Sequence, residues 1–540
     1  MKTARPSRQS GAVVLLLVAA LLLGGVLFAY HALNVASVRV ERELATNEAL
    51  TKAKDALIAY GVADTVRPGQ LPCPDVNDDG EAKSTDDFNA ATGACNSLIG
   101  RLPWITLGLP DLRDDNGERL WYAVSADFRS GNAAVALNSD TAYRVGHASL
   151  TLAGTTPASN LVAMVFAPGK TLRRSDGASQ ARGCTVGTDC DATLKCTTSP
   201  ASLTPKCNPA NFLDLDAASG VDNADPNISF VAATESASFN DKLLPIHSDD
   251  IMRLVERRAA RELAQHLRDH YDGWAALAGA PGHTGFRGFY PYAATWWDPS
   301  APPQVGAPGN TLGLLPLSSA PLVWSNASAS CSGNGTSTLD CSSLVLCLLI
   351  CLTNFSGRVE NVATRFVDPP GPPSVQVLGV ALAGSPNWTL NTAQRRLEFS
   401  YSGGVLAIGV ARIVVSAPAA STWTTGWLAQ NNWQQNAGYV FAGGYAIDGA
   451  NTCGGAAPSC LTLSNTAAPN NNKRAIVAMS GRSLASAGQM QRPVSTPADI
   501  DEFFEGLNAD LNFIQFEANA RTATFNDTLM FVDTLGQVGP

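Results

Sequence analysis

Residues 12–29 read AVVLLLVAALLLGGVLFA and contain no charged side chain. An apolar run of about 18 residues is long enough to cross the hydrocarbon core of a bilayer as a helix. Lys2, Arg5 and Arg8 precede the run, and no acidic residue accompanies them. Such a basic flank keeps an N-terminus on the cytoplasmic side. The sequence therefore predicts one membrane-spanning helix, with the rest of the chain on the far side.

The apolar run passes without a break into a polar segment that keeps helical periodicity as far as residue 60. Apolar residues recur there at intervals of three or four, with one gap, which is the spacing of one helix face: Leu33, Ala36, Val40, Leu44, Leu50, Ala53, Leu57 and Tyr60. At 1.5 Å per residue, residues 12–60 would form one helix of about 75 Å.

The composition favours a large exported body that is rich in strands and turns. The chain has 540 residues, of which 45% are hydrophobic and 15% charged, so it can bury the cores of two or three domains. Its 47 glycines and 32 prolines predict many turns. A net charge of −9 excludes the basic footprint of a nucleic-acid-binding protein. We therefore expect an α+β fold with a long N-terminal helix and a β-rich head.

An internal repeat predicts that the head contains two related β-rich modules. Three blocks recur in the same order: residues 161–172 with 475–484, residues 211–214 with 502–505, and residues 238–243 with 524–529. Between the copies, Ser248 is a good N-cap for a segment with a single apolar stripe. The expected modules are therefore residues 61–247 and 273–540, joined by a helix over residues 248–272.

The twelve cysteines are even in number and fall in local clusters, which in an exported chain indicates disulfides. Spacing alone does not fix the connectivity, and the nearest neighbours suggest three pairs: Cys73–Cys95, Cys331–Cys341 and Cys453–Cys460. A zinc site is the alternative, but it needs two close ligand pairs. Only Cys347 and Cys351 are that close, and they lie in an apolar run without a second pair nearby.

One acidic loop matches the calcium-binding pattern D-x-[DN]-x-[DN]-G, in which oxygen ligands at alternate positions surround a hard cation. Its expected ligands are Asp75, Asn77, Asp79, Glu81 and Asp86. A glycine at position 80 permits the sharp turn that such a loop requires. The expected cofactor is Ca²⁺, and the alternative is an acidic loop that is merely solvated.

The leader RQSG before AVVLL, residues 8–16, resembles the leader of type IV pilins and pseudopilins. The resemblance implies that a prepilin peptidase cuts between Gly11 and Ala12, which separates a leader, residues 1–11, from the helix, residues 12–60. Methylation of the new N-terminus is also implied. The chain departs from the family at Ala12, where Phe or Met is usual, and at Leu16, where most members carry Glu. A plain signal anchor and a cleaved secretory signal peptide are the alternatives.

The motifs LPCPD, GRLPW and RLWYAV within residues 71–124 extend this resemblance to poorly described prepilin-type proteins of Gram-negative bacteria. It implies pilin-like heads and a minor pilin or pseudopilin, tip-located or initiating, in a type IV pilus or type II secretion filament. The expected partners are other pilins through the N-terminal helix, the prepilin peptidase and the inner membrane. The expected location is a single-pass inner-membrane protein with a periplasmic head, which a filament would carry to the cell surface.

No catalytic motif appears in the sequence: there is no HExxH, Walker loop or GxSxG element. We therefore expect no enzymatic activity. The alternative function is a membrane-anchored periplasmic binding protein or enzyme that does not enter a filament.

Overall fold

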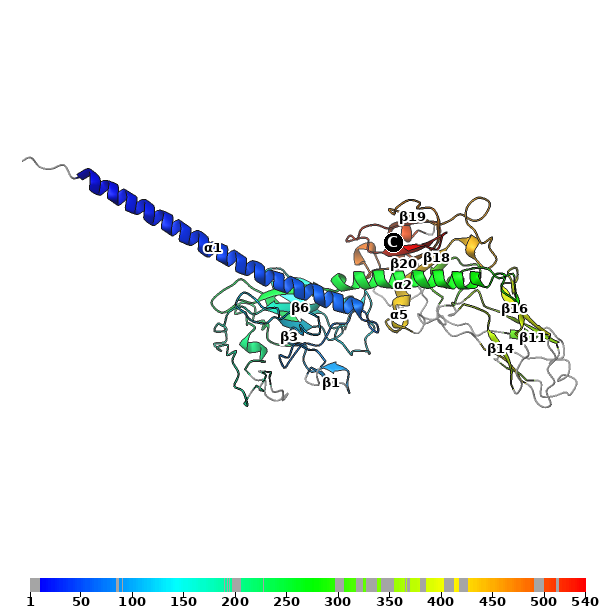
Figure 1. Cartoon of the computed structure of the whole chain (residues 1–540), viewed down its shortest axis with the longest axis horizontal. Coiled ribbons are helices and arrows are strands. Elements are labelled where there is room, and N and C mark those ends of the chain that lie inside the picture. Colours follow the sequence, from blue (N-terminus) through cyan, green and yellow to red (C-terminus); the bar gives the residue numbers. More distant parts are fainter. Residues whose placement is uncertain are drawn as a thin grey trace, which may run out of the picture. The chain divides into compact units, whose positions relative to one another are not determined.

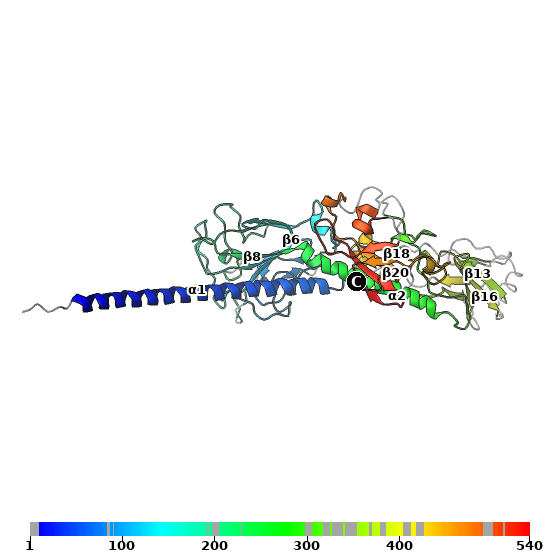
Figure 2. The same ribbon diagram turned by 90° about the horizontal axis from the view of Figure 1, so that it is seen from above.

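The structure is a computed structural model, and Figures 1 and 2 show it from two directions. It describes residues 10–83, 87–89, 91–188, 190–191, 193, 195–196, 205–226, 228–296, 305–316, 324–326, 338–340, 354–364, 366, 370–378, 385–402, 412–416, 426–489, 500–510 and 514–540. The chain divides into two compact units. Unit 1 comprises Met1–Tyr60, Leu71–Gly131 and Leu150–His247, and unit 2 comprises Gly61–Gln70, Asn132–Ser149 and Ser248–Pro540.

Unit 1 begins with helix α1 (Ser10–Ala63), which is 54 residues long. In its C-terminal half, Leu50, Ala53 and Leu57 are buried, in keeping with their helical spacing. Both views place this half alongside the sheet of unit 1, while the N-terminal half extends beyond the sheet (Figures 1 and 2). Lys54 Nζ also donates to the carbonyl oxygen of Pro245, 3.0 Å away. One helix therefore packs along half of its length and projects along the other half.

The prediction of a membrane-spanning helix was wrong for the part of the chain that the structure describes. No helix in the described part of the chain combines the length and apolarity needed to cross a bilayer. The prepilin-type signal and the single-pass inner-membrane location depended on that helix, and they are corrected with it.

The strands of unit 1 form one six-stranded sheet and one small hairpin. The large sheet has the order β3-β4-β6-β5-β7, and β8 also pairs with β6. All of its pairings are antiparallel except β5 with β7. The strand bounds are β1 (Phe88–Asn89), β2 (Ala94–Cys95), β3 (Ile99–Arg101), β4 (Trp121–Val124), β5 (Leu150–Gly154), β6 (Ala158–Ala167), β7 (Ser229–Ala232) and β8 (Lys242–His247).

The central strand β6 is buried on both faces from Leu161 to Ala167, which explains why this part of its sequence is continuously apolar and does not alternate. On one face, Met164 and Phe166 pack in a core with Trp121, Phe212 and Phe230. Phe166 and Phe230 meet edge to face, with ring centroids 5.1 Å apart. This core holds the segment after β6 against the sheet.

Unit 2 contains helix α2 (Ser248–Ala276), which begins at the expected N-cap residue and carries Asp249 and Asp250 in its first turn. One face of α2 packs on β20 and β22 of a five-stranded sheet with the order β10-β18-β20-β22-β23. The antiparallel strands of this sheet are β10 (Leu312–Leu314), β18 (Ala437–Phe441), β20 (Lys473–Met479), β22 (Thr528–Asp533) and β23 (Val538–Gly539).

The remaining strands of unit 2 form three further sheets, with the orders β11-β13-β16-β15-β9, β12-β17-β14 and β19-β21. Their bounds are β9 (His283–Thr284), β11 (Trp324–Asn326), β12 (Thr338–Asp340), β13 (Asn354–Val359), β14 (Ser374–Leu378), β15 (Asn387–Asn391), β16 (Arg396–Ser402), β17 (Arg412–Ser416), β19 (Thr462–Ser464) and β21 (Gln515–Glu517). A short helix, α5 (Trp427–Gln430), precedes β18.

Two segments from the first half of the sequence belong to unit 2: Gly61–Gln70 and Asn132–Ser149. Both are held there by hydrogen bonds: Asn431 Nδ2 donates to the carbonyl oxygen of Val66 at 3.3 Å, and two further bonds hold the second segment. The N–H of Leu137 donates to Asn431 Oδ1 at 3.1 Å, and Asp140 Oδ1 accepts the N–H of Ser483 at 2.7 Å. The chain therefore crosses between the units several times.

The repeated sequence blocks build the same buried cluster in both units, beginning with unit 1. Asp214 Oδ2 accepts the N–H groups of Asn240 (2.6 Å) and Asp241 (3.1 Å), and Asp241 Oδ2 accepts the N–H of Asp214 (2.8 Å). Gln180 Nε2 donates to Asp214 Oδ1 at 2.9 Å. Asn223 Nδ2 donates to Asp241 Oδ2 at 3.0 Å. This cluster fixes the turn that leads directly into β8.

Unit 2 repeats the arrangement side chain by side chain. Glu505 Oε2 accepts the N–H of Asn526 (2.9 Å), and Asp527 Oδ2 accepts the N–H of Glu505 (3.1 Å). Gln489 Nε2 donates to Glu505 Oε1 at 2.7 Å, and Asn508 Nδ2 donates to Asp527 Oδ2 at 2.9 Å. The turn that this second cluster fixes leads into β22. The repeated sequence blocks therefore form the same hydrogen-bonded cluster before one strand of each sheet.

Candidate functional site

The acidic loop that begins at Asp75 folds around the carboxylate of that residue. Asp75 Oδ1 accepts the N–H groups of Asn77 (3.1 Å) and Asp78 (2.6 Å), and its Oδ2 accepts the N–H of Gly80 (2.7 Å). Gly80 has a φ of +85°, in the left-handed region that favours glycine. Burial is the main reason why the pKa of Asp75 is raised to about 7, and the charge of Asp87 adds to the effect.

The expected calcium ligands are not gathered into a coordination shell in the described structure. Both oxygens of Asp75 are occupied by backbone N–H groups, and Asp79 lies 3.5 Å from Lys195 Nζ. Asn77 Nδ2 donates to Asp79 Oδ2 at 3.2 Å, Glu81 is exposed, and Asp86 lies outside the described residues. Among the residues searched, no three acidic, cysteine or histidine side chains form a group that could hold a metal.

Calcium binding stays a prediction that thermal unfolding can test. If Ca²⁺ binds this loop, about 5 mM CaCl₂ should raise the Tm by about 2–4 °C, because a ligand of the folded state stabilises it. The same concentration of MgCl₂ should have a smaller effect, and Asp79→Ala should abolish the rise. An unchanged Tm in CaCl₂ would contradict calcium binding.

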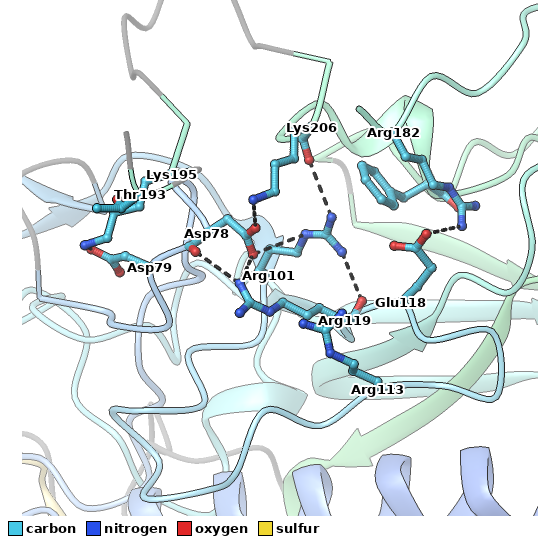
Figure 3. Close-up of a pocket in the computed structure, with 11 residues that line it drawn as sticks. Asp78, Asp79, Arg101, Arg113, Glu118, Arg119, Arg182, Thr193, Lys195 and Lys206 are labelled. Atoms are coloured by element: carbon cyan, nitrogen blue, oxygen red, sulfur yellow. Dashed lines mark hydrogen bonds and ion pairs between the residues drawn. The ribbon is translucent and has the colours of Figure 1, made fainter. Parts of the chain in front are cut away.

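A pocket of about 440 Å³ lies beside the same loop in unit 1 (Figure 3). Its lining is unusually rich in charge. Three carboxylates contribute, from Asp78, Asp79 and Glu118. Six cations face them: Arg101, Arg113, Arg119, Arg182, Lys195 and Lys206. These residues come from four parts of the chain: the acidic loop, the end of β3, the turn before β4 and the segment between β6 and β7.

Asp78 is the centre of the pocket's ion pairs. Its carboxylate lies 2.8 Å from Arg119 Nη1, 2.6 Å from Lys206 Nζ and 3.9 Å from Arg101 Nε (Figure 3). Burial alone would raise the pKa of Asp78, but these three cations hold it below its usual value. One buried carboxylate is therefore shared by three positive groups.

Arg101 is the most deeply placed cation of the pocket, with only 4% of its surface exposed. Its guanidinium lies over the rings of Trp121 and Phe212, at 4.5 and 4.0 Å from their centroids. Burial lowers its pKa to about 10, although Asp78 acts in the opposite direction. Arg101 therefore stays charged at neutral pH, and its aromatic neighbours hold it in place.

Two disulfides hold the segment that supplies one wall of the pocket: Cys184–Cys190 and Cys196–Cys207. The second encloses Lys206, and the N–H of Cys196 donates to the carbonyl oxygen of Asn77 at 2.9 Å. The cross-links thus position the lysines opposite the acidic loop.

The other residues singled out in the sequence are placed as follows. Cys73 is bonded to Cys95, and Cys453 is bonded to Cys460. Cys331 and Cys341 lie outside the described residues. Gly11 and Ala12 lie in the first turn of α1, which begins at Ser10.

Sequence reasoning missed the cations of the pocket. Arg101 and Arg119 stand inside the motifs GRLPW and GERLW, and Lys206 directly precedes a cysteine. The position of Lys206 next to Cys207 was the sequence signal that could have pointed to this pocket. Comparison with protein families, with curated proteins and with solved structures gave no match. The site is therefore interpreted from its own chemistry.

Proposed function

We propose that the protein is a minor pilin-like subunit, tip-located or initiating, of a type IV pilus or a type II secretion filament. The observation that carries this proposal is the projecting half of α1. Seven of its large apolar side chains are exposed by half or more: Leu15, Leu16, Leu17, Val18, Leu21, Leu22 and Leu23. An apolar surface of this kind marks an interaction site.

The distribution of these residues around the helix indicates the kind of partner. Consecutive positions are 100° apart, so the four residues from Leu15 to Val18 present apolar groups on nearly every side. A helix that is apolar all round requires partners all round. Burying one such side chain contributes about 1.5–3 kcal/mol. A bundle of similar helices from neighbouring subunits, as in the core of a pilin filament, satisfies this requirement.

The size of the chain supports a tip or initiating position. Unit 2 includes the whole of Ser248–Pro540, in addition to the complete helix-and-sheet unit that precedes it. Such bulk would crowd the lattice of a filament shaft if it were repeated at every position.

Charge placed on the projecting helix should prevent incorporation into a filament. We expect Leu16→Glu combined with Leu22→Glu to remove the full-length protein from sheared, sedimented filaments of the cells that naturally make it. A buried carboxylate without a partner costs several kcal/mol in an apolar bundle. Leu535→Glu is the matched control, because Leu535 of unit 2 is 80% exposed and lies outside α1.

The partner can be identified by a photo-crosslinking residue at position 16. Crosslinks to other pilin-like subunits in the filament fraction would support the proposal. Absence of the unaltered protein from that fraction, or crosslinks only to proteins that form no filament, would overturn it.

A further inference from the structure

We propose that the charged pocket of unit 1 binds a small ligand carrying a doubly charged phosphate group. This binding site is independent of the filament role proposed above, because all of its lining residues lie in unit 1 and none belongs to α1. The inference stands on the charge balance, the size and the walls of the pocket.

The charge balance of the pocket favours a dianion. Six cations and three carboxylates line it. Asp111, which is not part of the lining, also pairs with Arg113 (2.6 Å) and Arg119 (2.9 Å). Counted together with Asp111, the lining carries two more positive than negative groups. A phosphate monoester near neutral pH carries close to two negative charges and would neutralise them.

Two of the cations can turn toward a ligand at low cost. The side chains of Lys195 and Arg113 are 45% and 47% exposed, and their present partners are Asp79 at 3.5 Å and Asp111 at 2.6 Å. Ion pairs that are this exposed contribute little. Arginine and lysine are also the side chains that proteins use most for phosphate, through planar forks and point charges.

The three cations deepest in the pocket are held in place by their ion pairs with Asp78. Figure 3 shows Arg101, Arg119 and Lys206 directed together at Asp78. Because Asp78 is already paired with all three, its repulsion of an incoming anion is reduced. The pocket volume of about 440 Å³ lies in the range of small-molecule sites, and it exceeds what one phosphate needs. A phosphate attached to a sugar-sized group would fit.

Calorimetric titration of the full-length protein with inorganic pyrophosphate tests the inference. We expect Lys195→Glu to weaken binding by about tenfold, because each 1.4 kcal/mol of lost interaction changes the affinity by that factor. Glu118→Gln should strengthen binding by about threefold, since it removes a carboxylate from the lining. Lys170→Glu is the matched control, as Lys170 is exposed in unit 1 and lies outside the lining.

The unfolding midpoint of each variant shows whether its fold is intact. Binding should also weaken as the NaCl concentration rises. Comparison with long-chain polyphosphate separates two sources of the phosphate: similar affinities indicate a small ligand, and much tighter binding of the chain indicates a phosphate-bearing polymer. Absence of pyrophosphate binding by the unaltered protein would overturn the inference, and so would equal weakening in Lys195→Glu and Lys170→Glu.

Discussion

Substitution of Asp241 with asparagine should stabilise unit 1 at pH 8 and make its stability less dependent on pH. Burial, followed by the charge of Asp214, raises the pKa of Asp241 well above its usual value. Asp241 also forms a side-chain hydrogen bond with Asp214, so its extra proton can be donated to that carboxylate. An asparagine would place an N–H donor there and would keep an acceptor for Asn223.

The direction of the pH effect on stability follows from the number of protons that the folded and unfolded states bind. An aspartate in the unfolded chain has a pKa of about 3.9, whereas the folded protein holds the proton of Asp241 to a much higher pH. Between these two pKa values the folded state binds more protons, so the free energy of unfolding falls as the pH rises. The slope is about 1.4 kcal/mol per pH unit for one group. The contribution of Asp241 to stability is therefore greatest near pH 4 and smaller at pH 8.

Urea unfolding between pH 4 and pH 8 measures this effect. We expect Asp241→Asn to be more stable than the unaltered protein by about 1–3 kcal/mol at pH 8, with a smaller difference at pH 4. Asp527→Asn should behave likewise in unit 2, because burial and Glu505 raise the pKa of Asp527 in the same way. The exposed Asp501 supplies the control, Asp501→Asn. A steeper pH dependence in Asp241→Asn would contradict this explanation.

Replacement of Arg521 with methionine should destabilise unit 2 by about 3 kcal/mol. Arg521 Nη1 lies 2.5 Å from the carboxylate of Glu256, which is only 1% exposed on helix α2. Ser139 Oγ supplies the other short hydrogen bond to this carboxylate, at 2.6 Å. Burial raises the pKa of Glu256 and Arg521 opposes that effect, so removal of the arginine leaves a poorly compensated buried charge.

Thermal unfolding of three variants separates the effect of losing the ion pair from the effect of losing side-chain packing. Glu256→Met combined with Arg521→Met should recover most of the loss, because a buried pair can be replaced by apolar side chains at little cost. Arg268→Met on the same helix is the control, since its exposed pair with Asp269 should contribute less than about 1 kcal/mol. Equal losses in the single and double methionine variants would show that the ion pair itself is not the cause.

Local sequence patterns predicted those elements whose signals lie within one short stretch of sequence. The apolar stripe and N-cap placed the start of α2 at Ser248, and the structure extends it to Ala276. The continuous apolar run of β6 and its counterpart β20 occupy equivalent places in the two sheets. The long N-terminal helix also forms, although its interpretation as a membrane span was wrong. Helical periodicity fixes the conformation of a segment, but it does not identify what surrounds that segment.

The pocket could not be predicted because its residues are distant in the sequence. Arg101 and Lys206 meet Asp78 only because β3 and a disulfide-bonded segment are brought to the same side of the acidic loop. The acidic pattern of that loop suggested calcium. In the folded protein these carboxylates are engaged by N–H groups and cations from elsewhere. A short motif does not show which distant charges will compete with a metal.

Unit 2 is assembled from three separate stretches of the chain. Because Gly61–Gln70 and Asn132–Ser149 are part of unit 2, this unit cannot be completed until residues after Ser248 have joined them. Strands β22 and β23 lie side by side in the five-stranded sheet of unit 2. A polypeptide severed between His247 and Ser248 would thus yield two fragments that each hold part of one hydrophobic core. The first fragment would hold the whole of unit 1, and unit 2 would be complete only when the two fragments associate.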